Sequence, residues 1–334
     1  MTPLAQALSA SPELFPAALD PVSGAVTLWR LSREDYQRAG FLDGRIAAGK
    51  PARQIAFSEL ARAVDEAKLP ENCHFIFHIG HVGSTLLSRL LGRHPALFSL
   101  REPDILRTLT ACPPDLRLRQ LPVFLKLWSR NFEPARAIVK TTSFVSEIAA
   151  ELLSRPYNPR ALAVGVSPEI YLATIFGGAN APSEARALAP SRLSRLKRRL
   201  AAEWRLEDLG KGEIVGMGWL CEALSIAEAV ATANARVLVV NFEDFLNNAH
   251  RALGTAFAHL GVHQSEAEIS DILDGPEMRA YSKAPEYQYN ADTRRAVLAD
   301  GRTRHAREIR EGLLWLERVA AQNASVGRAL LLFN

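Results

Sequence analysis

The sequence predicts a three-layer α/β fold in which helices cover both faces of a mainly parallel sheet. From residue 73 onward, short apolar runs alternate with helical patterns, which is the arrangement of repeated strand–helix–strand units. The chain has 334 residues, 48% of them hydrophobic and 23% charged, so it is long and apolar enough for a large core. We expect one core domain over residues 71–334, with residues 1–70 packed on it as an extension.

The extension carries three local signals. The run VTLWRL (26–31) is rich in residues that favour strands, and Ser32 followed by Asp35 predicts the start of a helix. The run FSELARAVDEAKL (57–69) has the periodicity of an amphipathic helix. We expect a mainly helical extension that contributes no catalytic group.

The core is expected to contain alternating strands and helices. The expected strands are 75–79, 136–140, 160–166 and 236–242. The expected helices are 86–93, 145–154, 169–176, 182–208, 217–234 and 244–260. We expect the arginines within 191–199 to face solvent, because a run of charges on a helix is usually hydrated.

The stretch FIFHIGHVGSTLLSRLL (75–91) is the most informative part of the chain. An apolar strand ends at a glycine-rich turn (80–85), and a leucine-rich helix follows. Inward-facing N–H groups and the start of a helix attract anions, so this turn predicts a phosphate site. The expected ligand-binding residues are Gly80, Val82, Gly83, Ser84 and Thr85. The alternative is an ordinary strand-to-helix turn in which Ser84 caps the helix.

The turn is not a Walker A loop, because no lysine follows either glycine at the required spacing. This disfavours ordinary ATP or GTP chemistry. A phosphotransferase with a degenerate loop stays open as an alternative, and it would need magnesium and a nucleoside triphosphate.

Residues 73–265 resemble the sulfotransferases that use 3'-phosphoadenosine 5'-phosphosulfate (PAPS). Residues 81–87 resemble the Lys/Arg-Ser-Gly-Thr/Ser-Thr loop of that family and the apolar helix after it. Further matching stretches are 101–103, 135–144, 160–174 and 236–262. The resemblance implies a parallel sheet with a modified P-loop, PAPS as cosubstrate and no metal ion.

The resemblance also implies three catalytic residues. Glu102 lies eight residues after His94, at the position of the catalytic base in the tyrosylprotein branch of the family. Lys140 ends a strand, as the lysine of the family does, and His81 stands where the family carries a cation. The alternatives are a surface carboxylate, a lysine at a strand edge and a histidine in an exposed loop.

The region that binds the 3'-phosphate in the family departs from its pattern. Val166 stands in place of the family's arginine, and Glu169 at the next helix start would repel an anion. Thr174 keeps a hydroxyl at the expected place, and Lys283 lies where a late basic loop closes over the nucleotide. Other cations that would supply the charge are Arg160, Arg294 and Arg295.

The composition excludes several classes of partner. A net charge of +4 is too small to indicate nucleic-acid binding. No apolar run is long enough to predict a membrane span. Three scattered cysteines form neither a disulfide framework nor a metal pair, and residues 1–20 do not resemble a signal peptide. His74, His78 and His81 have no nearby carboxylate or thiol that would complete a metal site. We expect a cytoplasmic protein.

The sequence therefore predicts a sulfotransferase-like protein that transfers a sulfuryl group from PAPS to a hydroxyl or amine acceptor. A non-catalytic nucleotide-binding protein of the same fold is the main alternative, because Val82 and Val166 replace polar residues of the family. The identity of the acceptor stays open, since acceptor pockets are built from variable loops.

Overall fold

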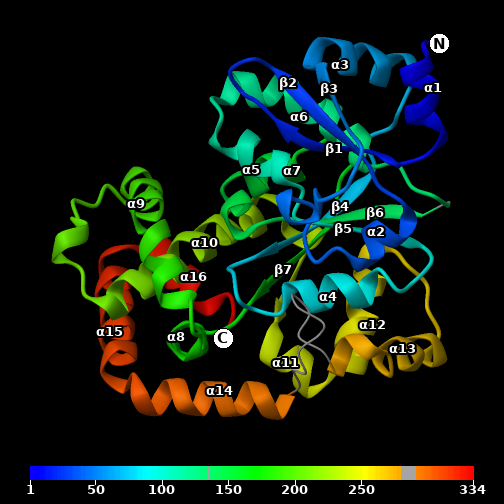
Figure 1. Ribbon diagram of the computed structural model, residues 1–334. Helices are drawn as coiled ribbons and strands as arrows, with labels where there is room; N and C mark the ends of the chain where they lie inside the picture. The colour runs from blue at the N-terminus through cyan, green and yellow to red at the C-terminus, as the bar shows by residue number, and fades with distance from the viewer. Residues whose placement is uncertain (134, 280–290) are drawn as a thin grey trace.

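The centre of the protein is a five-stranded sheet. A computed structural model describes residues 1–133, 135–279 and 291–334. The strand order is β5-β6-β4-β7-β8, and all neighbours are parallel (Figure 1). The strands are β4 (Cys73–His78), β5 (Leu97–Arg101), β6 (Arg136–Lys140), β7 (Ala161–Gly165) and β8 (Val237–Asn241). This confirms the predicted parallel α/β fold.

Strand β4 occupies the middle of this sheet. Phe75 pairs with Val139 of β6 on one side and with Ala161 of β7 on the other, and all six residues of β4 are buried. After β4 the chain crosses to one edge of the sheet and later builds the other side beyond β7. Ligands of open α/β sheets bind at the carboxyl ends of strands where the chain reverses direction in this way. The turn after β4 therefore lies at the expected place for a ligand.

Helices cover both faces of the sheet. Helix α4 packs on β4, β5 and β6, whereas α10 packs against α7 and β4. The helices after β4 are α4 (Ser84–Leu91), α5 (Asp104–Ala111), α6 (Pro114–Trp128), α7 (Ala149–Leu153), α8 (Pro168–Gly177), α9 (Ala181–Leu200) and α10 (Lys211–Ala233). After β8 follow α11 (Phe242–Asn247), α12 (Ala249–Leu260), α13 (Glu266–Leu273), α14 (Ala291–Arg304), α15 (Ala306–Gln322) and α16 (Ala324–Leu331).

The N-terminal segment differs from the helical extension that we expected. It contains a three-stranded antiparallel sheet in the order β1-β2-β3, which contacts α5 and α6 through β1. Its elements are α1 (Pro3–Ala10), β1 (Leu14–Leu19), β2 (Ala25–Arg30), α2 (Arg33–Arg38), β3 (Ala52–Ala56) and α3 (Phe57–Glu66). The predicted helix start is correct: Ser32 and Asp35 form a reciprocal capping box at α2.

Two elements near the site were not predicted as they are. Strand β5 is only five residues long and lies between proline-containing turns, so it carries too short a pattern to detect. Residues Ser143–Ile148 form a 3-10 helix before α7, instead of one continuous helix.

Helix α10 is both long and apolar. The segment Lys211–Arg236 is long and apolar enough to cross a membrane, but 78% of its most apolar window is buried inside the protein. It therefore acts as the core helix of the fold, between α9, α15 and the sheet.

The prediction that the arginines of α9 face solvent was wrong for two of them. Arg192 and Arg195 are buried. Arg195 donates to both carboxylate oxygens of Glu222 on α10, at 3.0 and 2.9 Å, and to Glu147 at 2.6 Å. Burial opposes the charge of Arg195, but Glu222 outweighs it and raises the pKa of the guanidinium. These ion pairs attach α9 to α10.

Candidate active site

The turn after β4 has an unusual backbone. Gly80, His81 and Gly83 have φ angles of 88°, 55° and 68°, all in the left-handed region that non-glycine residues seldom adopt. His81 therefore holds a conformation that costs energy. The chain then enters α4 at Ser84, so the turn folds tightly in front of the first turn of that helix.

Gly83 is a glycine for a packing reason. A Cβ atom at this position would lie 1.9 Å from Cζ of Phe242. Phe242 begins α11, directly after β8, and its ring is buried. The aromatic ring thus rests against the backbone of the turn, and any side chain at Gly83 would displace it. A bulky substitution at Gly83 therefore disturbs packing before it reports on ligand binding.

The start of α4 has no side-chain cap. Gly83 is the N-cap residue, so within the described part of the chain no side chain caps the first N–H groups of the helix. Ser84 is the first helical residue and not the cap. Thr85 is 2% exposed, and its Oγ1 atom has no hydrogen-bond partner among the described residues. Because a buried hydroxyl without a partner is destabilising, this arrangement fits a ligand oxygen at the turn.

Glu102 and Lys140 lie side by side. They follow or end two neighbouring strands, and Arg101 pairs with Lys140 in the sheet. The Lys140 side chain is fully buried and forms an ion pair with Oε1 of Glu102. Glu102 has a φ of 53°, and its N–H donates to the carbonyl of Lys140 at 2.7 Å. Backbone and side chain together aim this carboxylate at the ends of β5 and β6.

His81 has an acidic partner that the sequence did not reveal. Its Nε2 atom lies 3.4 Å from Oε2 of Glu184, in the first turn of α9. Both side chains remain partly exposed. This contact places an acidic side chain beside the imidazole. The only signal in the sequence was a single acid at the start of a basic helix.

One cavity contains part of this group of residues. It has a volume of about 430 Å³ and is lined by Gly80 and His81 of the turn, by Glu102 and by residues of α8 and α9, but not by Thr85 or Lys140. Its polar side contains Gly80, His81, Glu102 and Glu184. Its apolar side contains Phe41, Phe144, Ile175 and Leu188. Arg45, Arg107 and Arg192 also line it, so the cavity combines a size typical of a small-molecule site with a charged wall.

The described residues that were expected to contact a 3'-phosphate form hydrogen bonds within the protein instead. Val166 is buried, and its carbonyl accepts from Nε1 of Trp219 at 2.9 Å. The Thr174 hydroxyl donates to the carbonyl of Ile170 within its own helix at 2.7 Å. Lys283 lies outside the described residues.

The nearby charged residues pair with one another instead. Glu169 accepts two hydrogen bonds of 2.8 Å from Arg302 of α14, so the acid at the start of α8 is neutralised. Arg294 donates to Glu243 of α11 at 2.8 Å, and its guanidinium lies 5.2 Å from the centre of the Phe242 ring.

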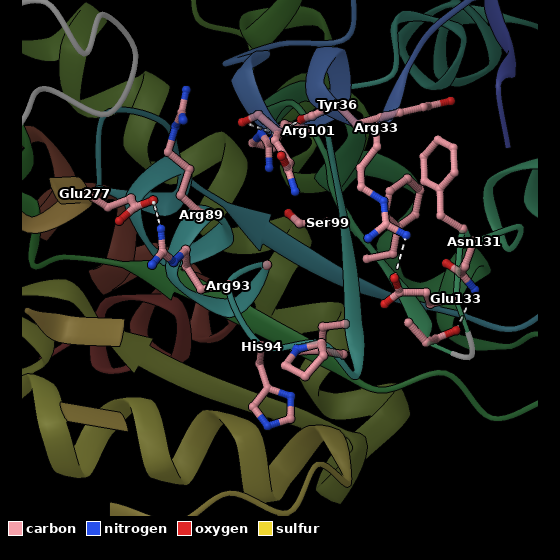
Figure 2. A pocket seen from close by; sticks show the side chains of 17 residues that line it. Arg33, Tyr36, Arg89, Arg93, His94, Ser99, Arg101, Asn131, Glu133 and Glu277 are labelled. Carbon is pink, nitrogen blue, oxygen red and sulfur yellow. Dashed lines mark hydrogen bonds and ion pairs between the residues drawn. The ribbon is translucent and has the colours of Figure 1, made fainter. Parts of the chain in front are cut away.

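A second cavity of about 490 Å³ lies beside the edge strand β5, between α2 and the C-terminal end of α4. In Figure 2, Arg33 pairs with Glu133 and Arg93 pairs with Glu277; the distances are 2.8 and 3.5 Å. Of the residues predicted for the site, none that the structure describes lines this cavity.

Arg101 is one of the residues that line this second cavity (Figure 2). Its guanidinium donates to the carbonyls of Tyr36 and Ala39 at the end of α2, the latter at 2.6 Å. Burial, together with the charge of Arg89, lowers the pKa of Arg101 to about 9. Arg101, the residue before Glu102, thus connects the end of β5 to the N-terminal segment. This is a structural role.

No family model matches this chain, and no curated protein matches it. Several solved structures are similar to it. One is the sulfotransferase domain from the curacin biosynthetic pathway, with 16% identity over 76% of this chain and 97% of that chain and a TM-score of 0.46.

Two further similar structures are a mouse sulfotransferase, SULT7A1, complexed with PAP, and the sulfotransferase STF9 from Mycobacterium avium. The mouse protein has 14% identity over 82% of this chain and 92% of that chain, with a TM-score of 0.40. The mycobacterial protein has 13% identity over 74% and 80%, with a TM-score of 0.40. These scores are too low to assign an activity, so function must be judged on this chain's own residues.

Proposed function

We propose that this protein transfers a sulfuryl group from PAPS to a hydroxyl or amine acceptor. The observation that carries the proposal is the shared cavity: Gly80 and His81 of the glycine-rich turn line the same space of about 430 Å³ as Glu102. A donor held at the turn and an acceptor held at Glu102 would meet there. Such positioning is a large part of any group-transfer catalysis.

The turn fits the phosphosulfate end of the donor. The N–H groups at the start of α4 and the unpartnered hydroxyl of Thr85 offer hydrogen bonds to anionic oxygens. Gly80, Val82, Gly83 and Ser84 supply the remaining backbone of this cradle. When bound, PAPS supplies an activated sulfuryl group on a good leaving phosphate.

The side chains around the cavity have separate tasks. Glu102 accepts the proton of the acceptor hydroxyl. Lys140 holds the Glu102 carboxylate in place through its ion pair and provides positive charge beside the reacting groups. His81, in its protonated form, balances charge on the departing phosphate, and Glu184 holds the imidazole there.

Recognition of the 3'-phosphate requires a cation other than the missing arginine. Lys283 is our proposed cation for it. Thr174 would contribute only after its hydroxyl leaves the carbonyl of Ile170. Arg160 is a poorer candidate, because it donates to the carbonyl of His259 at 2.6 Å.

A second candidate is a nucleotide-binding protein of this fold that performs no transfer. The buried Val166 favours it, because this valine stands where the family has the arginine that contacts the 3'-phosphate. A phosphotransferase is less favoured, since the turn lacks the lysine that contacts a nucleoside triphosphate.

Calorimetry with 3'-phosphoadenosine 5'-phosphate (PAP), AMP and ATP tests the proposal. We expect PAP to bind most tightly. Thr85→Val should weaken PAP binding about tenfold, which corresponds to about 1.4 kcal/mol, without loss of stability. Thr110→Val is the matched control, because the Thr110 hydroxyl is buried and already satisfied within its own helix. Equal binding of AMP and PAP, or no binding, would contradict PAPS as the donor.

Turnover separates the two candidates. Sulfuryl transfer from PAPS to any member of a panel of alcohols, phenols and amines would exclude the non-catalytic protein. Binding of PAP without turnover of any of these acceptors would favour it.

A further inference from the structure

His78 occupies the point where the sheet meets the glycine-rich turn. It is the last residue of β4, and its side chain is buried. It lines the same cavity as Gly80, His81 and Glu102. Neither its position in the sequence nor the proposed reaction had given it a task.

The hydrogen bonds of His78 fix its protonation state and tautomer. The N–H of Gly80 donates to Nδ1 at 3.0 Å, so the lone pair of that nitrogen is used. A neutral imidazole carries one proton, which must then be on Nε2. Nε2 lies 2.9 Å from the carbonyl oxygen of Thr141 and donates to it.

Thr141 is itself held in the sheet. Its N–H and its hydroxyl both donate to the carbonyl of Ile76 in β4, at 3.0 and 3.2 Å. The carbonyl that accepts from His78 is therefore rigid. The imidazole of His78 therefore links Thr141, which follows β6, to the backbone N–H of Gly80 and fixes the distance between them.

The same ring borders Lys140. Nζ of Lys140 lies 3.2 Å from Nε2 of His78. Because Nε2 carries a proton, the ammonium of Lys140 cannot donate to it. The ring therefore blocks this side of the ammonium, which forms its ion pair with Glu102.

We propose that His78 is a positioning residue that sets the phosphate-binding turn and the Lys140–Glu102 pair at the correct separation. The imidazole performs this task in its neutral form, with the proton on Nε2. This inference rests on the proposed function for the roles of the turn and of the pair. It adds one residue that acts on both the turn and the Lys140–Glu102 pair.

Two substitutions separate the two halves of this task. In His78→Asn, the amide oxygen takes the place of Nδ1, so the bond from the Gly80 N–H is kept and the bond to Thr141 is lost. In His78→Gln, the amide nitrogen takes the place of Nε2, so the bond to Thr141 is kept and the bond from Gly80 is lost.

The measurements are PAP affinity by calorimetry and nitrogen NMR of the histidine and lysine side chains. For His78→Asn we expect PAP affinity within about threefold of wild type and a shifted Lys140 ammonium resonance. For His78→Gln we expect about tenfold weaker PAP binding and an unshifted Lys140 resonance. The Lys140 resonance is assigned by its disappearance in Lys140→Arg.

Equal effects of the two variants on both readouts would overturn the positioning role while leaving the proposed function intact. A wild-type His78 with its proton on Nδ1 would also overturn it, even if neither variant folds. If the wild-type protein binds no PAP, the proposed function fails and the positioning role fails with it. An Nε2–H tautomer together with the opposite behaviour of the two variants would support the inference.

Discussion

The contact between Gly83 and the Phe242 ring predicts a large cost for a small substitution. In Gly83→Ala, the new methyl group would lie 1.9 to 2.4 Å from three ring atoms of Phe242. Displacing a buried ring in this way costs about 1–3 kcal/mol. Holding alanine at a φ of 68° adds about 1–2 kcal/mol. We therefore expect a loss of about 3 kcal/mol in the free energy of unfolding.

Gly24→Ala is the matched control. Gly24 has a φ of 69°, and an added Cβ there meets no atom within 4 Å. Only the backbone cost of about 1 kcal/mol should appear. The difference between the two variants isolates the contact with the ring.

Urea denaturation and calorimetry measure both effects. For a chain of 334 residues, an unfolding entropy of about 2.1 cal/mol/K per residue converts 3 kcal/mol into a drop in Tm of about 4 °C. The double variant Gly83→Ala/Phe242→Leu should recover at least about 1 kcal/mol relative to additivity. If Gly83→Ala costs no more than Gly24→Ala, or if the two changes simply add, the ring does not rest on the turn.

Three further outcomes are expected. Glu222→Gln should lower the free energy of unfolding by about 3–5 kcal/mol, because it leaves the buried Arg195 without its bidentate partner; a loss below 1 kcal/mol in urea denaturation would contradict this. Burial, with help from Arg136, lowers the pKa of His74 to about 3, so its contribution is complete above pH 6.5 and is lost as the pH falls towards 3. At pH 4 the loss should be about 3 kcal/mol and should vanish in His74→Gln when unfolding is compared at pH 7 and pH 4. Glu102→Gln should reduce sulfuryl transfer at least about a hundredfold while PAP affinity stays within threefold; retained turnover would remove Glu102 as the base.

Local signals in the sequence predicted the central architecture. The apolar runs of β4, β6 and β7 belong to strands that are buried almost throughout, and the run of β8 belongs to a half-buried strand at the edge of the sheet. The glycine-rich turn follows β4 directly. Glu102 and Lys140 come together because two parallel neighbouring strands end at the same edge of the sheet.

The missed features depend on contacts between distant parts of the chain. Glu184 meets His81 only because α9 lies beside the turn. The burial of Arg195 depends on its ion pair with Glu222, a residue of the long apolar helix α10. His78 looks in the sequence like a strand residue, and its proposed task arises from the position of Thr141, which follows a different strand, β6. Such pairings leave no periodic pattern in one segment, so local reasoning does not find them.

The central position of β4 also has a kinetic consequence. Its Phe75 is held between Val139 and Ala161, both far along the chain, so closing two long loops must precede its pairing. Folds dominated by such distant pairings cross their folding barrier slowly. We therefore expect β4, the strand that leads into the glycine-rich turn, to form late, together with the rest of the sheet. Its backbone amides should exchange with solvent only when the entire domain unfolds.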